Sequence, residues 1–546
     1  MTLFAWMGRF SAALERPFSV RWTPHTIKFM LAALVAYGFA VVLYLSTREN
    51  RRPGEEHGSA KWGSAKRLNA KYRDKDPRNN TILTQNVRMS LNGKMHRRNL
   101  LQIVIGGSGA GKTRFFVKPN LMEANCSFLV TDPKGETLRA VAPLLIQKGY
   151  VIKVFDLIDP SHSDSFNALA YIRDDKDVMK LVNNFIKNTT PKGAQQNDPF
   201  WERSEIALDT ALILYLIHEA PPEEQNFEML IYMIENGGAK EDDDDYQSPL
   251  DLLFEALEEE YPNHIAVREY KIYKQAAGKT AKSILVSAAV RLAPFNLPQI
   301  KAVTDHDDMD LYTLGERKCA LYAVIPDNDT TFTFLVSLLY SQIFQTLYYC
   351  ADQIHHGALP CHVHFILDEA PSVNLPGLPR ELATMRSRNI SCSTIIQNMA
   401  QIKELYKDSW ETIPGNSDTL LYLGGNEAST HKYISEALGK STIDTKTHGQ
   451  TKGRSGSYST NFQMSGRELL TPDEVRMLDN RYCILFIRGT RPVMDEKYEL
   501  MEHPAIRYTM DGGGPPYIHH GTAEPPITGE PLFQTDFDNE KENAAA

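Results

Sequence analysis

The feature that most restricts the fold of this chain is the glycine-rich stretch GGSGAGKT, which directly follows the apolar run LLQIVI. It fits the pattern G-x-x-x-x-G-K-[ST] in full, and a strand, a loop and a helix are expected here in the required order. In such a loop the glycines let successive backbone N–H groups surround phosphates, the lysine neutralises phosphate charge, and the threonine hydroxyl can hold Mg²⁺. We therefore predict a site for ATP and Mg²⁺ formed by Gly106, Gly107, Ser108, Gly109, Ala110, Gly111, Lys112 and Thr113.

A second G-K-T triplet occurs at Gly278, Lys279 and Thr280. Tyr273 stands where the leading glycine would be required, and the surrounding residues have the periodicity of a continuous helix. This triplet is not expected to bind phosphate.

An ATPase site also needs a carboxylate at the end of an apolar strand, and the run HFILDEA supplies Asp368 followed by Glu369. Asp368 is predicted to hold Mg²⁺, and Glu369 to orient and deprotonate the attacking water. An acidic strand end is a weak signal alone, because such ends are common. Together with the phosphate loop upstream it becomes a strong one.

The run NISCSTIIQN predicts the next strand and places Gln397 at its carboxyl end, where a sheet of this type binds ligands. Gln397 could sense the γ-phosphate, or it could be an ordinary surface glutamine. Arg386 and Arg388 precede the strand. An arginine supplied by a neighbouring subunit could stabilise transition-state charge, and a solvent-facing role is the alternative.

Short apolar runs that end in polar turns recur from Asn99 onward, which predicts buried parallel strands of an α/β fold. Between residues 175 and 294 helical periodicity replaces the strand signals, so we predict an inserted all-α domain there. The six cysteines show neither CxxC spacing nor a zinc pattern, which favours reduced thiols. The predicted strand runs are LLQIVIGG, CSFLVTDPKG, VIKVFDL, CALYAVIPD, HVHFILDEA, DTLLYLGG and YCILFIRG.

The residues 29–45, FMLAALVAYGFAVVLYL, carry no charge and predict one transmembrane helix within a membrane anchor at 1–47. A buried core helix and a cleaved signal peptide are the alternatives, but basic flanks and the absence of a small-residue cleavage site argue against both. Residues 1–20 could form a second, weakly hydrophobic membrane segment or an interfacial helix. Because ATP is cytosolic, the body after the anchor is expected in the cytoplasm.

Charge is distributed unevenly along the chain, whose formal net charge is −9. Residues 48–98 hold 14 Lys and Arg against 5 Asp and Glu, a basic juxtamembrane segment that could face anionic lipid or a DNA backbone. The acidic run at 241–245 predicts a solvated loop. Residues 511–546 combine Gly and Pro clusters with acidic residues, so a disordered acidic tail is predicted.

The motifs together resemble the TraG/TraD-like type IV coupling proteins, a family of hexameric RecA-like motors. Besides both nucleotide motifs, the chain shares features with the family over roughly residues 58–504. They are LVTDPKGE, SFNAL, DPFWERSE, ALYAVIPD, RSRNISCSTIIQ, YLGGNEASTHKYISEALG, and REL followed by DEV.

The resemblance implies a RecA-like nucleotide-binding domain formed by residues 99–174 and 295–510. It also implies that Arg386 acts in trans on the neighbour's nucleotide and that Gln397 senses nucleotide. Asp132 and Lys134, with Glu136, correspond to the family's DPKGE turn, where a structural role is as plausible as a chemical one.

The implied partners are single-stranded DNA with its bound relaxase, the components of a type IV secretion channel, the membrane, and further copies of the chain in a homo-hexamer. The implied function is a membrane-anchored ATPase that pumps this DNA into the channel during conjugation. This chain departs from the family in showing one convincing membrane span where two are common.

Three rival functions remain open at this stage. A double-stranded DNA pump of the septum usually carries several spans and a C-terminal winged helix, which are not visible here. A coupling protein for protein effectors only is compatible with the sequence. A non-hydrolysing scaffold that recruits cargo is the rival from another class, and two intact nucleotide motifs argue against it.

Overall fold

The computed structural model describes residues 7–8, 10–11, 22–47, 55–190, 199–238, 247–276, 278–329, 331–450 and 458–521. Two compact units are formed, the first by residues 1–59 with 440–467 and the second by residues 60–439 with 468–546. Most of the predicted second membrane segment at 1–20 and the predicted acidic loop at 241–245 lie outside the described residues.

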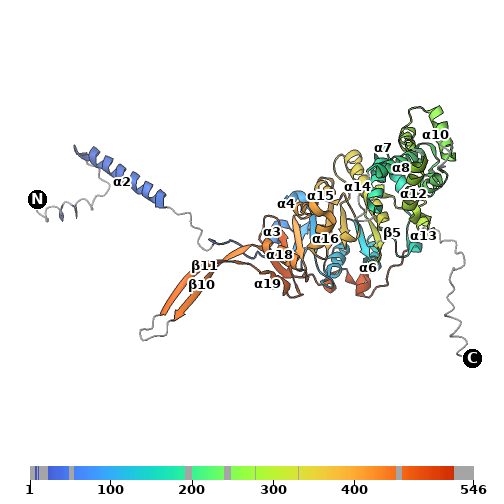
Figure 1. The fold of residues 1–546 in the computed structure, drawn as a ribbon. Coiled ribbons are helices and arrows are strands. Elements are labelled where there is room, and N and C mark those ends of the chain that lie inside the picture. Colours follow the sequence, from blue (N-terminus) through green and yellow to red (C-terminus); the bar gives the residue numbers. More distant parts are fainter. Residues whose placement is uncertain are drawn as a thin grey trace, which may run out of the picture. The chain divides into compact units, whose positions relative to one another are not determined.

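The second unit is built on a nine-stranded sheet with the order β13-β12-β9-β3-β8-β7-β4-β6-β5 (Figure 1). All neighbouring pairs from β9 to β5 are parallel, whereas β12 pairs antiparallel with both β9 and β13. Each predicted apolar run forms a strand of this sheet, so the predicted mainly parallel α/β sheet is confirmed. Its edge strand β13 was not predicted, and neither were the strands of the two smaller sheets. The strands are β3 (Leu101–Ile105), β4 (Ser127–Pro133), β5 (Val151–Asp156), β6 (Cys319–Ile325), β7 (Val363–Leu367), β8 (Ile390–Ile396), β9 (Thr419–Tyr422), β12 (Tyr482–Ile487) and β13 (Val493–Glu496).

Both faces of the sheet are covered, which is why its strands read as continuous apolar runs. In β3, Ile103 and Ile105 belong to one hydrophobic cluster and Val104 belongs to the other. The helices of the sheet body are α5 (Lys118–Met122), α6 (Glu136–Gln147), α14 (Thr333–Tyr349), α15 (Leu378–Thr384), α16 (Met399–Tyr406), α17 (Thr412–Asn416), α18 (Ala428–Leu438) and α19 (Pro472–Arg476).

The predicted helical block lies between β5 and β6 and is drawn mainly in green in Figure 1. Its buried side chains, among them Leu212 and Phe295, belong to the same hydrophobic cluster as the sheet residues Leu101 and Phe365. The block therefore packs within one compact unit with the sheet. Its helices are α7 (Asp175–Thr189), α8 (Pro199–Glu219), α9 (Phe227–Glu235), α10 (Pro249–Glu260), α11 (Ile265–Lys274), α12 (Gly278–Leu292) and α13 (Pro298–Ala302).

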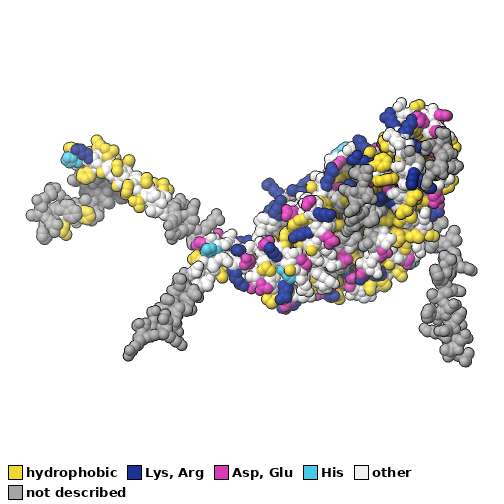
Figure 2. Space-filling model, in the orientation of Figure 1, with side chains coloured by type: hydrophobic (Ala, Val, Ile, Leu, Met, Phe, Trp, Pro, Cys, Tyr) yellow, Lys and Arg dark blue, Asp and Glu magenta, His cyan; other side chains and the backbone are white. Residues whose placement is uncertain are grey.

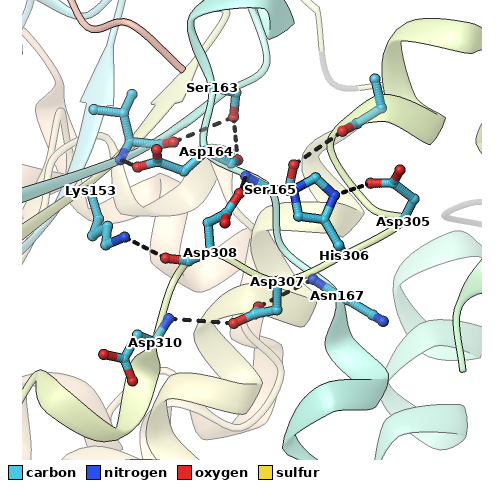
Figure 3. A network of polar contacts seen from close by, with 12 residues as sticks. Lys153, Ser163, Asp164, Ser165, Asn167, Asp305, His306, Asp307, Asp308 and Asp310 are labelled. Atoms are coloured by element: carbon cyan, nitrogen blue, oxygen red, sulfur yellow. Dashed lines mark hydrogen bonds and ion pairs between the residues drawn. The ribbon is translucent and has the colours of Figure 1, made fainter. Parts of the chain in front are cut away.

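A polar network joins the two ends of this helical block where they leave and re-enter the sheet (Figure 3). The backbone N–H of Ser165 donates to Asp308 Oδ2 over 3.4 Å, and that of Asn167 donates to Asp307 Oδ1 over 3.3 Å. Tyr171 Oη also donates to Asp307. The motif SFNAL at residues 165–169 therefore holds the two ends of the helical block together, which gives this motif a structural role.

The basic segment predicted at 48–98 is part of the folded body from residue 60 onward. Leu68 and Tyr72 of α3 (Ala65–Tyr72) are buried, and the hairpin of β1 (Asn80–Ile82) and β2 (Arg88–Ser90) buries Ile82 and Met89. These apolar residues anchor the segment, while its Lys and Arg side chains remain largely on the surface. The short helix α4 (Gly93–His96) follows.

The predicted disordered tail begins too early at residue 511. Asp511 forms an ion pair with the buried Lys118 at 3.0 Å, and His519 contacts Asp164 Oδ1 at 3.0 Å. These contacts hold the chain against the body, where Lys118 also pairs with Glu136 at 2.8 Å and Asp164 also accepts from the N–H of Val154 at 2.9 Å. Each adds a partner to a buried charged group. The remaining part of the predicted tail, 522–546, lies outside the described residues.

The first unit contains α2 (Thr26–Thr47) and the two-stranded sheet of β10 (Lys440–Gln450) and β11 (Tyr458–Glu468). The 22 residues of α2 span about 33 Å, enough to cross the hydrocarbon layer of a membrane. None of them is buried, and Figure 2 shows apolar side chains along the helix. The predicted span at 29–45 thus lies in a helix with the length and composition of a membrane anchor.

Candidate nucleotide site

The predicted site residues Lys112, Thr113, Asp368, Glu369 and Gln397 meet at the carboxyl edge of the parallel sheet. The phosphate loop follows β3, the acidic pair follows β7, and Gln397 follows β8. Strand β8 lies between the other two, so it places Gln397 between the phosphate loop and the acidic pair. Carboxyl ends of parallel strands are the usual ligand edge of such a sheet.

The phosphate loop has the backbone that its sequence requires. Gly109 and Gly111 have φ values of 75° and 83°, a region that favours glycine, and a Cβ on Gly111 would lie 2.3 Å from the Phe115 ring. Lys112 Nζ is buried and donates to the carbonyl of Gly106 over 3.0 Å. The lysine is thus folded over the loop, where it can reach a phosphate.

The two residues predicted to hold Mg²⁺ are in direct contact. Thr113 Oγ1 donates to Asp368 Oδ2 over 3.0 Å. Burial raises the pKa of Asp368 to about 6, which a nearby cation would offset. A hydroxyl and a carboxylate are the hard oxygen ligands that Mg²⁺ prefers, so the donor set fits this metal.

Glu369 and Gln397 are linked by a hydrogen bond from Gln397 Nε2 to Glu369 Oε1 of 3.1 Å. Glu369 also has a positive φ of 51°, an uncommon conformation for a residue other than glycine. The strained turn after β7 directs Glu369 differently from its neighbour Asp368, although the two are adjacent in sequence.

The turn that follows β4 completes the pocket, whose volume is about 330 Å³. Asp132 is buried and accepts hydrogen bonds from the N–H groups of Thr137 and Leu138, at 3.2 and 2.7 Å. Lys134 is exposed and paired with Asp327 at 2.7 Å. Asp132 therefore shapes the turn, and it lines the pocket together with Lys134 and Glu136.

Sequence reasoning missed two supports of the phosphate loop. Lys497 is buried and donates from Nζ to the carbonyl of Ala110 over 3.1 Å. The N–H of Gly107 donates to the carbonyl of Gly424 over 2.8 Å. Lys497 has no local motif and lies 387 residues from the loop, so only the folded sheet brings it there. The contact of Gly424 could have been expected, because the GGNE segment follows the predicted strand β9.

Arg386 does not join the site within its own chain. It lies in a short 3-10 helix, Met385–Arg388, before β8, whereas Gln397 follows β8. The seven residues of β8 separate them by about 23 Å. Arg388 is engaged locally, since its guanidinium contacts Asp352 at 2.6 Å.

Comparison with known proteins places this geometry in a family. The family described as "Type IV secretory system Conjugative DNA transfer" matches residues 59–507, well over half of the chain. VirD4 of Agrobacterium fabrum (strain C58 / ATCC 33970) is 25% identical over 431 residues, covering 75% of this chain and 58% of that protein. The conjugal transfer protein TraG of Rhizobium radiobacter is 22% identical over 412 residues, covering 72% of this chain and 60% of that protein. The chain thus spans about three fifths or less of the curated relatives that it matches.

Solved structures show the same fold. The unbound bacterial conjugative coupling protein TrwBdeltaN70 has a TM-score of 0.60 at 15% identity, covering 84% of this chain and 98% of that chain. TrwB in complex with the ATP analogue ADPNP has a TM-score of 0.59 at 14% identity, covering 82% of this chain and 96% of that one. The predicted RecA-like P-loop fold is therefore confirmed, and the chain belongs to the type IV secretory system conjugative DNA transfer family, the type IV coupling proteins.

Proposed function

We propose that this chain is a membrane-anchored ATPase that moves single-stranded DNA with its bound relaxase into a type IV secretion channel. The observation that carries this proposal is the meeting of Lys112, Thr113, Asp368, Glu369 and Gln397 at one edge of the sheet. Each of the groups needed for hydrolysis has a side chain of the right chemistry there.

In this proposal Lys112 and the loop N–H groups hold the β- and γ-phosphates of ATP. Thr113 and Asp368 hold Mg²⁺, which neutralises charge on the phosphates. Glu369 accepts a proton from the attacking water. Of the two adjacent acidic residues, Asp368 contacts Thr113, which leaves the Glu369 carboxylate for this role. That TrwB was crystallised with ADPNP, and with ADP and Mg²⁺, supports this choice of ligands.

Gln397 is proposed to report the state of the nucleotide to the rest of the sheet. Its side chain links Glu369 to the end of β8, and its N–H donates to Gln401 Oε1 over 3.0 Å. Loss of the γ-phosphate would release the Glu369 side chain. A movement of Glu369 would then reach α16 through its hydrogen bond with Gln397.

The proposed arrangement is a homo-hexamer anchored by α2, with the body in the cytoplasm where ATP is available. Arg386 would then contact the nucleotide of the next copy. Family membership and the length of α2 support this arrangement. The proposed cargo rests on family membership, and delivery of protein effectors alone is the second candidate.

The proposal is tested with the full-length chain in lipid nanodiscs. ATP turnover is measured with single-stranded DNA, with double-stranded DNA of equal length, and with neither. Stimulation by single strands above duplex is the expected result. Turnover that responds to a candidate effector protein but not to DNA would favour the second candidate, and absence of turnover in all three conditions would favour a scaffold.

A further inference from the structure

The turn that follows β4 brings a further cation, Lys134, to the lining of the nucleotide pocket. Two other cations of this lining are engaged close to the phosphate loop. Lys112 is folded onto the loop itself, and Arg114 pairs with Glu499 at 3.2 Å. Lys134 instead pairs at 2.7 Å with Asp327, which does not line the pocket. Lys134 is therefore a cation of the pocket whose partner lies outside it.

The backbone of Lys134 is held in an uncommon conformation. Its φ is 68°, and among the described residues that line this pocket, Lys134 and Glu369 are the two that are not glycine and have a positive φ. The N–H of Lys134 donates to the carbonyl of Ile325 over 3.1 Å, and the buried Asp132 holds the turn that follows. Such strain persists where the surrounding structure imposes it, and it is concentrated at functional sites. The fold thus fixes the base of the Lys134 side chain at the pocket.

The ion pair between Lys134 and Asp327 can be exchanged at little cost. The two side chains are 63% and 44% exposed, and an exposed ion pair contributes little because water screens it. The hydrogen bond and the charge of Asp327 raise the pKa of Lys134, and the charges of Glu369 and Glu136 raise it further, so the side chain is a cation at neutral pH. A phosphate that enters the pocket offers Lys134 a more highly charged partner than Asp327.

The order of the strands indicates which phosphate Lys134 can meet. In the order β3-β8-β7-β4, the phosphate loop follows β3, whereas the turn of Lys134 follows β4 and lies beyond β7. Strand β7 leads to Asp368 and Glu369, and in the proposed mechanism Glu369 acts on the water that attacks the γ-phosphate. A cation from the turn after β4 therefore approaches the γ-phosphate from the side opposite to the phosphate loop.

Charge in the pocket favours this contact. A nucleoside triphosphate brings its own negative charge into a lining that already holds several carboxyl groups. Movement of Lys134 from Asp327 toward the γ-phosphate would offset part of that charge without adding a residue to the site. The carboxyl groups of the lining are those of Asp132, Glu136, Asp368 and Glu369.

We propose that Lys134 is a further phosphate-contact residue, which leaves Asp327 and binds the γ-phosphate when a nucleoside triphosphate enters the pocket. A nucleoside diphosphate leaves the pair of Lys134 and Asp327 in place, because it has no phosphate at this position. This inference rests on the proposed ATPase function and adds to it a means of distinguishing ATP from ADP.

The test compares the affinities of the full-length chain in lipid nanodiscs for ADPNP and for ADP, both with Mg²⁺. Lys134→Gln is expected to bind ADPNP about tenfold more weakly than the parent, while its affinity for ADP stays within about twofold. Asp327→Asn is expected to bind ADPNP about two- to fivefold more tightly than the parent, with ADP unchanged, because Lys134 then has no competing partner. If the ion pair only supported the turn, both substitutions would act in the same direction.

Three further variants serve as controls. Lys134→Arg should keep most of the preference for ADPNP, because the positive charge remains. Lys134→Gln combined with Asp327→Asn should bind like Lys134→Gln alone, since Asp327 acts through Lys134. Lys271→Gln breaks an exposed ion pair with Glu258 in the helical block, and this matched control should bind both nucleotides like the parent.

Equal weakening of ADPNP and ADP binding by Lys134→Gln, or weaker ADPNP binding by Asp327→Asn, would overturn the proposal. The use of affinities also keeps the two proposals distinct. If the parent binds ADPNP but does not hydrolyse ATP, the proposed function fails, and the ratio of the two affinities still decides the role of Lys134. A ratio in Lys134→Gln that equals that of the parent contradicts the inference.

Discussion

Gln397 and Glu369 are joined by a hydrogen bond of 3.1 Å between the ends of two neighbouring strands, β8 and β7. The pair connects the residue proposed to activate water with a side chain that follows the strand next to the phosphate loop. In the proposed mechanism this hydrogen bond orients the Glu369 carboxylate.

Loss of the Gln397 side chain should therefore slow hydrolysis without weakening nucleotide binding. We expect Gln397→Ala to lower ATP turnover about 10- to 100-fold, because Glu369 loses its orienting donor. ADPNP affinity, measured by fluorescence with a labelled analogue, should stay within about twofold of the parent. Gln397→Glu should be at least as slow, since it places a second carboxylate beside Glu369. A variant with normal turnover would show that the contact has no catalytic consequence.

The phosphate loop offers a test with an internal control. Lys112→Ala should lose measurable ATP binding, because the positive charge facing the β- and γ-phosphates disappears. Lys279→Ala changes the same residue in the second G-K-T triplet, which lies at the start of the helix α12. Lys279→Ala should bind ATP with the parent's affinity, as measured by calorimetry. Equal loss in both variants would contradict the assignment.

The contact between Thr113 and Asp368 predicts that nucleotide binding by a variant without the Thr113 hydroxyl depends little on Mg²⁺. Thr113→Val removes a hydroxyl ligand while keeping the volume of the side chain. Nucleotide binding by the parent should tighten when Mg²⁺ is added, whereas this variant should show little tightening. The affinity for ADPNP with and without Mg²⁺ checks this, and an unchanged metal effect would mean that other residues hold the ion.

The buried Asp132 predicts a pH dependence of stability. Burial raises its pKa to about 6 from an ordinary value of 3.8, so the folded state takes up a proton as the pH falls through 6 while the unfolded state does not. On lowering the pH from 8 to 5, this protonation should stabilise the parent by about 1 kcal/mol relative to Asp132→Asn, whose side chain does not titrate. Melting temperatures of both proteins at the two pH values, without nucleotide, measure the difference. A gap that is independent of pH would contradict the raised pKa.

Two truncations test the contacts made by the C-terminal stretch. Removal of residues 522–546 leaves these contacts in place and serves as the control. Removal of 511–546 also takes away one partner each of Lys118 and Asp164, which keep Glu136 and the N–H of Val154, and should lower the melting temperature by roughly 2–5 °C. Equal stability of the two truncated chains would show that residues 511–521 do not support the body.

The sequence predicted most of the sheet, because strands that are buried on both faces consist of apolar residues in continuous runs. It also predicted the residues at the carboxyl edge, since Asp368 and Gln397 each directly follow such a run and Lys112 lies in the glycine-rich loop after another. It could not show that β8 lies between β3 and β7, because strand order depends on contacts between distant segments.

Other features depended on three-dimensional packing in a similar way. Lys497, which follows the edge strand β13, supports the phosphate loop from far along the chain, and β13 itself is too polar to give a strand signal. The tail boundary at 511 was wrong because the Gly- and Pro-rich composition hid the ion pair between Asp511 and Lys118. The placement of Arg386 and Gln397 at opposite edges, by contrast, follows from the strand that the sequence already predicted between them.

The most direct test of the central claim compares the full-length parent with Glu369→Gln in lipid nanodiscs. ATP turnover is followed as single-stranded DNA is added, and ATP binding is measured in parallel. The parent should hydrolyse ATP faster as DNA is added. The variant should bind ATP with the parent's affinity but turn it over at least about 100-fold more slowly than the parent. If neither protein hydrolyses ATP, or if the variant is as active as the parent, the account of this site as a DNA-coupled ATPase is contradicted.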